Sequence, residues 1–236
     1  MEEQVKSKQR VTDHGEVFTA EREVKAMCDL VGRECDRIDS RFLEPACGNG
    51  NFLAEVLARK LAIVTGKYKK SPFDWERNAI LALSSVYGVD LLQDNCQECR
   101  DRLFAIWNKE YTRICKREAN NETRNAAKLI LLSNIVCGNA LSLMCVDEEQ
   151  NDTDRPIIFP EWTFPKNDAF IKRRDFRFDV MLKENPDENC YDQFSLFADD
   201  AMGLDNWELD PETHELIPKP VREFPLMHYR RLNDNV

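Results

Sequence analysis

No run of 18 apolar residues occurs in this chain of 236 residues, and its opening residues, Met-Glu-Glu-Gln-Val-Lys, contain no apolar segment. The first absence argues against a membrane-spanning helix, and the second argues against a secretory signal peptide. We therefore expect a cytoplasmic protein that does not enter a membrane.

The cysteines lack the pairing that a disulfide framework or a zinc site requires. There are nine of them, an odd number, and only Cys96 and Cys99 form a Cys-x-x-Cys pair. No second cysteine pair and no suitably spaced histidine pair completes a zinc site. Cys96 and Cys99 lie in a stretch with helical apolar spacing, so we expect them to be reduced structural thiols and expect no metal site.

Positive charge is also in short supply. The chain has 33 Lys and Arg against 43 Asp and Glu, which gives a formal net charge of −10. A chain this acidic does not attract nucleic acid by its overall charge, so contact with DNA phosphates requires a local basic patch or a basic partner. Residues 172–174, Lys-Arg-Arg, form one small basic cluster.

Hydrophobic residues make up 42% of the chain and concentrate before about residue 146. This content is enough for the core of one domain of ordinary size. We expect residues 1–146 to form that domain and residues 147–236 to form an irregular acidic extension that can dock on a partner. Residues 183–220 are expected to be largely loop or disorder. Residues 157–164 fit either a strand or a packed extended segment.

Strands and helices alternate along the first domain. The expected strands are 41–46, 86–90 and 134–139; the expected helices are 51–65, 74–84, one from 93 towards 115, and 121–131. Another helix is expected from Thr19, with Thr19 as its cap. This alternation predicts a parallel α/β sheet.

The stretch Phe42–Leu53, Phe-Leu-Glu-Pro-Ala-Cys-Gly-Asn-Gly-Asn-Phe-Leu, predicts a strand, a glycine turn and the start of a helix. Such a turn lets a ligand approach bare backbone, where amides and the helix dipole hold a polar group. A nicotinamide-dinucleotide site is disfavoured, since Leu53 stands where a third glycine belongs and the next strand-ending acid, Asp90, comes too late.

Two polar residues end the next two strands. The Asp90 carboxylate can accept two hydrogen bonds from ribose hydroxyls, or it can cap the helix that follows. Asn139 either binds a ligand or is an ordinary turn residue.

The Phe42–Leu53 stretch resembles motif I of S-adenosylmethionine-dependent DNA adenine-N6 methyltransferases. The stretch His14–Ala20, His-Gly-Glu-Val-Phe-Thr-Ala, is similar to motif X of these enzymes, usually Gly-x-x-Phe/Tyr-Thr-Pro, with Ala20 in place of the proline. With Asp90 and Asn139 as motifs II and III, the order resembles the type I and fused restriction-modification methylases. The resemblance covers about residues 12–145.

The resemblance implies a Rossmann-like class I methyltransferase fold, of which this chain holds the parallel-sheet half in whole or in part. It also implies S-adenosylmethionine as cofactor and DNA as partner. In the family, motif X packs beside the methionine end of the cofactor, and the motif III residue, usually Asp, bonds its adenine. The cofactor-binding residues implied are Phe18, Thr19, Glu44, Ala46, Gly48, Gly50, Asp90 and Asn139.

The family's catalytic Asn/Asp-Pro-Pro-Tyr/Phe motif occurs nowhere in the chain. The nearest string is 178–188, in which Asn185 comes one residue late and Asp187 and Glu188 replace the second proline and the aromatic residue. The catalytic residues are therefore unknown.

In the family the fourth strand pairs beside the first, so a chain with only three strands leaves the 41–46 strand as an open edge that seeks a partner. This favours a split enzyme, in which a second polypeptide supplies the fourth strand, the missing motif and DNA recognition. Two alternatives stay open: a non-catalytic or decayed S-adenosylmethionine-binding protein, and a methyltransferase that acts on RNA or protein.

Overall fold

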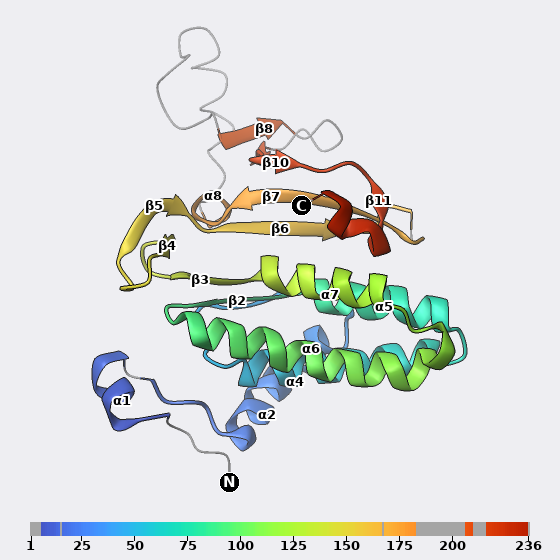
Figure 1. Ribbon diagram of the computed structural model, residues 1–236, viewed down its shortest axis with the longest axis horizontal. Coiled ribbons are helices and arrows are strands. Elements are labelled where there is room, and N and C mark those ends of the chain that lie inside the picture. Colours follow the sequence, from blue (N-terminus) through green and yellow to red (C-terminus); the bar gives the residue numbers. More distant parts are fainter. Residues whose placement is uncertain (1–5, 15, 167, 183–205, 210–215, 236) are drawn as a thin grey trace, which may run out of the picture.

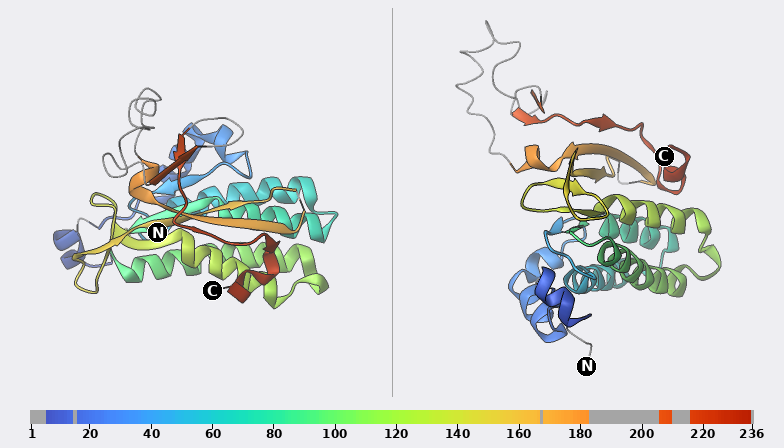
Figure 2. Two further views of the ribbon diagram at one scale, coloured as in Figure 1. Left: turned by 90° about the horizontal axis from the view of Figure 1, so that it is seen from above. Right: turned by 60° about the vertical axis from the view of Figure 1, so that its left-hand side comes forward.

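The computed structural model describes residues 6–14, 16–166, 168–182, 206–209 and 216–235. Its centre is a sheet with the strand order β1-β2-β3-β4-β5, covered on one face by helices α4 and α6 and on the other by a β-hairpin (Figures 1 and 2). The strands are β1 (Phe42–Glu44), β2 (Val86–Asp90), β3 (Ile135–Asn139), β4 (Met144–Val146) and β5 (Asp152–Pro156). The chain is a mixed α/β protein, as the alternation of strands and helices predicts.

The sheet combines parallel and antiparallel pairs. β1 pairs with β2 and β2 pairs with β3 in parallel, with Phe42 opposite Val86 and Gly88 opposite Ile135. β3–β4 and β4–β5 are antiparallel. The expectation of three strands is therefore wrong, because a turn closed by the Leu143 amide and the Asn139 carbonyl (2.8 Å) folds the chain back into β4.

The five described helices of ten or more residues in the first domain follow the predicted segments, whereas the three shorter ones correspond to no expected helix. Together they are α1 (Lys8–His14), α2 (Glu21–Leu30), α3 (Gly32–Cys35), α4 (Asn51–Tyr68), α5 (Pro72–Ser84), α6 (Gln93–Cys115), η1 (Lys116–Glu118) and α7 (Asn121–Asn134). The expected Thr19 cap is wrong: the chain stays extended through Ala20, which occupies the cap position of α2 without a side-chain bond. Within the described residues, no helix has the length and apolar character needed to cross a membrane.

The segment expected to be irregular contains regular elements in its described part. Besides β5, they are β6 (Ile158–Thr163), β7 (Phe170–Arg177), α8 (Phe178–Met181), β8 (Trp207–Leu209), β9 (Leu216–Pro218), β10 (Arg222–Glu223), β11 (Met227–His228) and η3 (Tyr229–Asn235). Residues 157–164 thus largely form a strand, β6. Residues 183–205 and 210–215, most of the segment expected to be loop, lie outside the described residues.

The β6–β7 hairpin covers the sheet face opposite α4 and α6 (Figure 1). The Tyr87 hydroxyl of β2 donates to the Pro160 carbonyl of β6 at 2.9 Å, and the Tyr87 and Phe159 rings meet edge to face. The Trp162 indole donates to the Asn134 side chain at 2.8 Å. Aromatic side chains with satisfied polar ends therefore hold the hairpin against the sheet.

The outer edge of β1 carries no strand in the described part of the chain, where β1 pairs only with β2. Leu43 in the middle of this strand is 40% exposed. The first strand is therefore an edge strand, as the sequence predicts for this part of the sheet.

Lys60 of α4 holds the segment that leads into β1 by hydrogen bonds from inside the core. Its side chain is fully buried, and its ammonium donates to the carbonyls of Ile38 and Ser40 and to the Ser85 hydroxyl. Burial lowers the pKa of Lys60 to about 8. Folding therefore favours the neutral amine, and this group adds stability as the pH rises from about 8 towards the ordinary value of 10.5.

We expect Lys60→Met to be destabilising, because it leaves the partly buried carbonyls of Ile38 and Ser40 without their donor. The gap between wild type and variant should widen by about 1 kcal/mol between roughly pH 7 and 9, since only the wild type gains stability there. Urea unfolding at both pH values measures the gap. A gap that narrows with rising pH would contradict the role given to Lys60.

Candidate functional site

A cleft of about 820 Å³ lies at the carboxyl ends of β1, β2 and β3. All of the residues singled out from the sequence except Gly50 line it: Phe18, Thr19, Glu44, Ala46, Gly48, Asp90 and Asn139. These residues come from four separate segments, and the parallel strands bring them to one edge. Gly50 instead lies buried beneath the turn, against Cys99.

The glycine turn adopts a backbone that side chains disfavour. Gly48 has φ +51° and Gly50 has φ +83°, both in the left-handed region. A Cβ at Gly48 would lie 3.2 Å from the Phe18 ring, and one at Gly50 would lie 2.6 Å from the Cys99 sulfur. The turn is therefore packed from both sides, with Phe18 above it and Cys99 below it.

Glu44 ends β1 with a carboxylate that lacks a full set of partners. Its Oε2 is buried and accepts no hydrogen bond from the described residues. Burial, and then the nearby Asp90 carboxylate, raise the pKa of Glu44 to about 7. A buried, unpaired carboxylate on the wall of a cleft suits a cationic ligand group, which would both pair with it and lower its pKa.

Asp90 holds the turn in place. Its Oδ2 accepts from the Gly48 amide at 2.8 Å, and its Oδ1 accepts from the Leu92 amide at 2.9 Å and from the Asn95 side chain at 3.2 Å. The carboxylate thus joins the end of β2 to the glycine turn and to the start of α6. The expectation that Asp90 caps the next helix is wrong in its literal form, because Leu92 occupies the cap position of α6 and has no side-chain cap bond. Asp90 instead accepts from the backbone of that cap residue, and it also lines the cleft.

Asn139 occupies a turn at the cleft's rim. Its side-chain oxygen accepts from the Leu141 amide at 3.0 Å, and its amide donates to the exposed Asp152 carboxylate at 3.0 Å. Leu141, which is 96% exposed, follows it on the rim. The described contacts of Asn139 are those of a turn residue. Its main effect on a bound ligand would therefore be to fix the conformation of the neighbouring rim residues.

The segment with Phe18 and Thr19 is tied to the start of α4. The Asn51 side chain donates to the Thr19 carbonyl at 3.1 Å, and Arg102 of α6 donates to the Asn51 side chain. Phe18 is 9% exposed, while Thr19 is exposed. This arrangement fixes one wall of the cleft.

Sequence reasoning missed four polar residues of the cleft, one of which is the Asn51 described above. Asn49 has a buried side-chain oxygen without a partner among the described residues. Glu16 and Asn95 also line the cleft, and Asn95 is only 1% exposed. Asn49 sits inside the glycine turn and could have been noted there, whereas a single asparagine in the first turn of a long helix carries no local signal.

Cys96 and Cys99 are free thiols and fully buried, as the sequence predicts for structural cysteines. Thiol–thiol bonding, and then burial, raise the pKa of Cys47 and Cys96 far above the ordinary value, so neither serves as a nucleophile at neutral pH. The His, Cys, Asp and Glu side chains of the described residues form no cluster of three or more that fits a metal ion.

The string that comes nearest to the missing catalytic motif does not form a fourth strand. Its first residues make α8 (Phe178–Met181), a short helix after β7, with Phe178 packed on Phe159. Asn185 and the rest of the string beyond residue 182 lie outside the described residues.

No protein-family model matches the chain, and neither a curated protein nor a solved structure matches it significantly. The cleft and the residues that line it are therefore the features of the molecule that point to a function.

Proposed function

We propose that this chain binds S-adenosylmethionine in the cleft and is the cofactor-binding part of a DNA adenine-N6 methyltransferase of a restriction-modification system. The observation that carries the proposal is the unpaired Glu44 carboxylate beside a left-handed glycine turn, at the carboxyl ends of parallel strands. Buried polar atoms without partners mark places where a ligand completes the hydrogen bonding.

The residues present fit this cofactor. Glu44 would accept from the α-ammonium group of its methionine part, which is the cationic group that its raised pKa calls for. Ribose hydroxyls would donate to the Asp90 carboxylate and replace part of the hydrogen bonds that its Oδ1 now accepts. Thr19 and Asn49 supply further polar groups to the lining of the cleft. When bound, S-adenosylmethionine supplies a methyl group that its sulfonium already activates.

A Rossmann-like class I methyltransferase fold is part of the proposal. The order β1-β2-β3 with parallel pairing agrees with it, and so do α4 after β1 and α6 after β2. The antiparallel strands β4 and β5 beyond β3 are an addition that the resemblance does not anticipate.

A second polypeptide completes the enzyme in this proposal. β1 offers its outer edge, which has no paired strand in the described residues and exposes Leu43. A strand laid there would extend the sheet next to the glycine turn and bring the Asn-Pro-Pro-Tyr motif to the cleft.

The partner would also provide most of the DNA contact. The basic cluster at 172–174 lies on β7, where Lys172 pairs with Glu223, Arg173 with Asp175 and Arg174 with Glu161. These pairs neutralise the charges that phosphates would need. The cluster therefore gives little support to DNA binding by this chain alone.

Calorimetry tests the central claim. We expect S-adenosylmethionine and S-adenosylhomocysteine to bind the purified chain with micromolar affinity and one-to-one stoichiometry, and we expect no heat with NAD. The proposal would be contradicted if neither S-adenosylmethionine nor S-adenosylhomocysteine bound, whether the chain was tested by itself or together with a candidate partner chain.

The second candidate function is a non-catalytic S-adenosylmethionine-binding protein, which the lack of an Asn-Pro-Pro-Tyr motif favours. Methyl transfer to adenine in duplex DNA separates the candidates. Transfer only after a motif-bearing partner is added supports the split enzyme, while binding without transfer in any combination supports the second candidate. Efficient adenine methylation by the isolated chain would contradict the need for a partner.

A further inference from the structure

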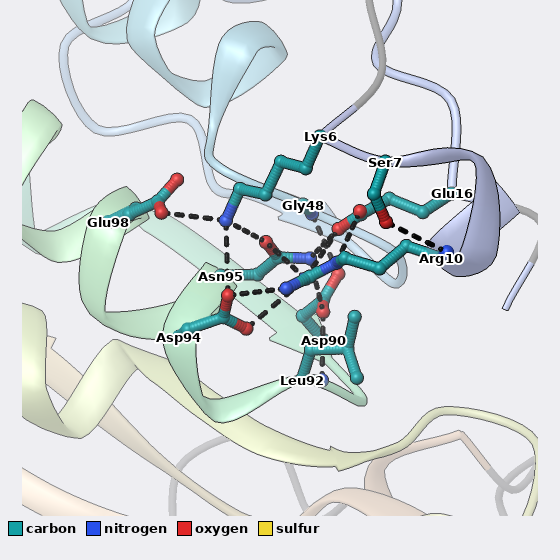
Figure 3. A network of polar contacts seen from close by, with 10 residues as sticks. All are labelled: Lys6, Ser7, Arg10, Glu16, Gly48, Asp90, Leu92, Asp94, Asn95 and Glu98. Carbon is teal, nitrogen blue, oxygen red and sulfur yellow. Dashed lines mark hydrogen bonds and ion pairs between the residues drawn. The ribbon is translucent and has the colours of Figure 1, made fainter. Parts of the chain in front are cut away.

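Residues 6–14 together with Glu16, which we call the arm, lie against the start of α6 (Figure 3). Arg10 of α1 reaches two carboxylates at once: it contacts Glu16 at 2.6 and 2.8 Å and Asp94 at 2.6 and 3.2 Å. Lys6 contacts Asp94 at 3.2 Å and Glu98 at 2.6 Å. The arm is thus held to α6 by charge.

Asn95 connects this arm to the cleft. Its side-chain oxygen accepts from Lys6 at 2.9 Å and from Arg10 at 3.2 Å. Its side-chain nitrogen donates to Glu16 at 2.7 Å and to Asp90 at 3.2 Å. An amide has two acceptor sites and two donor hydrogens, so every hydrogen-bonding position of this buried side chain is used.

The contacts run from the arm through Asn95 to Asp90. The cations of the arm hold the oxygen side of Asn95, which turns its nitrogen towards Asp90 (Figure 3). Asp90 in turn accepts from the Gly48 amide of the glycine turn. If the arm left, the side chain of Asn95 would lose what fixes its orientation, and the Asp90 carboxylate would lose a fixed donor.

The arm lies between two clefts. Arg10 and Asp94 line a second cleft of about 620 Å³, which shares Leu91 and Leu92 with the first. Glu16 and Asn95 line the first cleft. The arm is therefore beside the part of the proposed site where Asp90 and the start of α6 would meet a ribose.

We propose that Arg10, Glu16 and Asn95 are positioning residues of the cofactor site, which set the Asp90 carboxylate for the ribose hydroxyls. The proposal rests on the proposed function, because it concerns the same ligand. It adds that the arm is part of the binding site although Arg10 lines only the neighbouring cleft.

The charges of the arm persist across the physiological pH range. Hydrogen bonding to Arg10 lowers the pKa of Asp94 to about 2. Burial opposes ionisation of Glu16, but its bonds to Arg10 and Asn95 still lower its pKa below the ordinary value. The contacts of the arm are therefore tested better by changing the salt concentration than by changing the pH. The ion pair between Lys6 and Asp94 is partly exposed, and salt screening weakens such pairs.

The test measures the affinity for S-adenosylhomocysteine in wild type and in Arg10→Ala. We expect about tenfold weaker binding by the variant, the lower end of the loss caused elsewhere by removing an orienting partner. Arg10→Lys should recover part of the affinity. Arg113→Ala is the matched control, since it removes an arginine paired at 2.5 Å with Glu110 on its own helix, outside both clefts. It should bind as the wild type does.

A second ligand separates positioning from general loosening of the fold. S-adenosylhomocysteine without its two ribose hydroxyls should bind more weakly than the parent to the wild type, and the variant should show a smaller difference between the two ligands. Equal differences would mean that the arm does not act through Asp90, and this would overturn the inference. As the salt concentration rises, the affinity of the wild type for S-adenosylhomocysteine should fall towards that of Arg10→Ala.

The outcomes keep the two proposals apart. If the wild type binds neither ligand, the proposed function fails and the inference fails with it. If wild type and Arg10→Ala bind equally well, only the inference fails. Amide hydrogen exchange at Gly48 and Leu92 gives a ligand-free check, since both amides should exchange faster in the variant when Asp90 is less well held.

Discussion

Replacing Glu44 by Gln is expected to remove most of the cofactor binding and to make the ligand-free protein more stable above about pH 7. The stability gain follows from the buried position of the carboxylate, which raises its pKa from 4.5 to about 7. Folding therefore favours the protonated acid, and this contribution to stability is lost as the pH rises through 7. Glutamine keeps the shape without the charge and should add between about 1 and 3 kcal/mol near pH 8.

The binding loss has a separate cause. A hydrogen bond between a carboxylate and a ligand ammonium contributes about 1.5–3 kcal/mol, which corresponds to roughly 10- to 100-fold in affinity. Glu44 must also release its proton before it pairs with a cation. Affinity for S-adenosylmethionine should therefore fall by up to about tenfold per pH unit below 7 in the wild type and stay flat in Glu44→Gln.

Glu161→Gln is a matched control with the opposite sign. Burial opposes ionisation of Glu161, yet its bonds to Arg41 and Arg174 lower its pKa below the ordinary value. Its stabilising contribution is present at neutral pH and is lost as the pH falls through the lowered pKa, so the variant should be less stable at neutral pH. Urea unfolding from about pH 5 to 8 measures both variants. A Glu44→Gln protein that binds the cofactor normally would rule out the role assigned to Glu44.

The parts of the cleft that the sequence predicts are those with a local signal. A short apolar strand that ends in Glu44 or Asp90, followed by a glycine turn or a helix, can be recognised within a dozen residues. Because the carboxyl ends of parallel strands share one edge, separate local signals are enough to bring Glu44, Gly48, Asp90 and Asn139 together.

The parts that the sequence does not predict depend on contacts between distant residues. Lys6 and Arg10 meet Asp94 and Asn95 across more than 80 positions, and charged residues in a polar N-terminal segment look like a solvated tail. β6 and β7 escaped full prediction for a similar reason. The sequence left residues 157–164 open between a strand and a packed extended segment. The contacts of Phe159 with Tyr87 and of Trp162 with Asn134, which accompany the strand, join residues far apart in the chain.

Gly50→Ala is expected to be the most destabilising single-methyl change in the glycine turn. The left-handed φ of +83° costs an alanine about 1–2 kcal/mol. The added Cβ would also lie 2.6 Å from the Cys99 sulfur and 3.4 Å from the Cys99 Cα, which forces the turn away from α6. Together these effects should lower the free energy of unfolding by about 3 kcal/mol. They should also weaken cofactor binding, since the displaced turn carries the Gly48 amide away from Asp90.

Gly66→Ala is the matched control for this change. Gly66 lies inside α4, the helix whose N-cap is Gly50, and an added Cβ there would meet nothing within 4 Å. Alanine there should stabilise the protein by about 0.5–1 kcal/mol through helix propensity. Urea unfolding of the two variants therefore compares the same methyl group in a strained position and in an open one.

The double variant Gly50→Ala/Cys99→Ala separates the two costs. Removing the Cys99 sulfur relieves the contact at 2.6 Å but leaves the backbone strain. We expect the double variant to lose less stability than the sum of the single variants, which is the coupling that touching side chains show. If the losses of stability in the two single variants simply add up in the double variant, the glycine turn does not pack against Cys99. That result would contradict the described packing of the turn between Phe18 and α6.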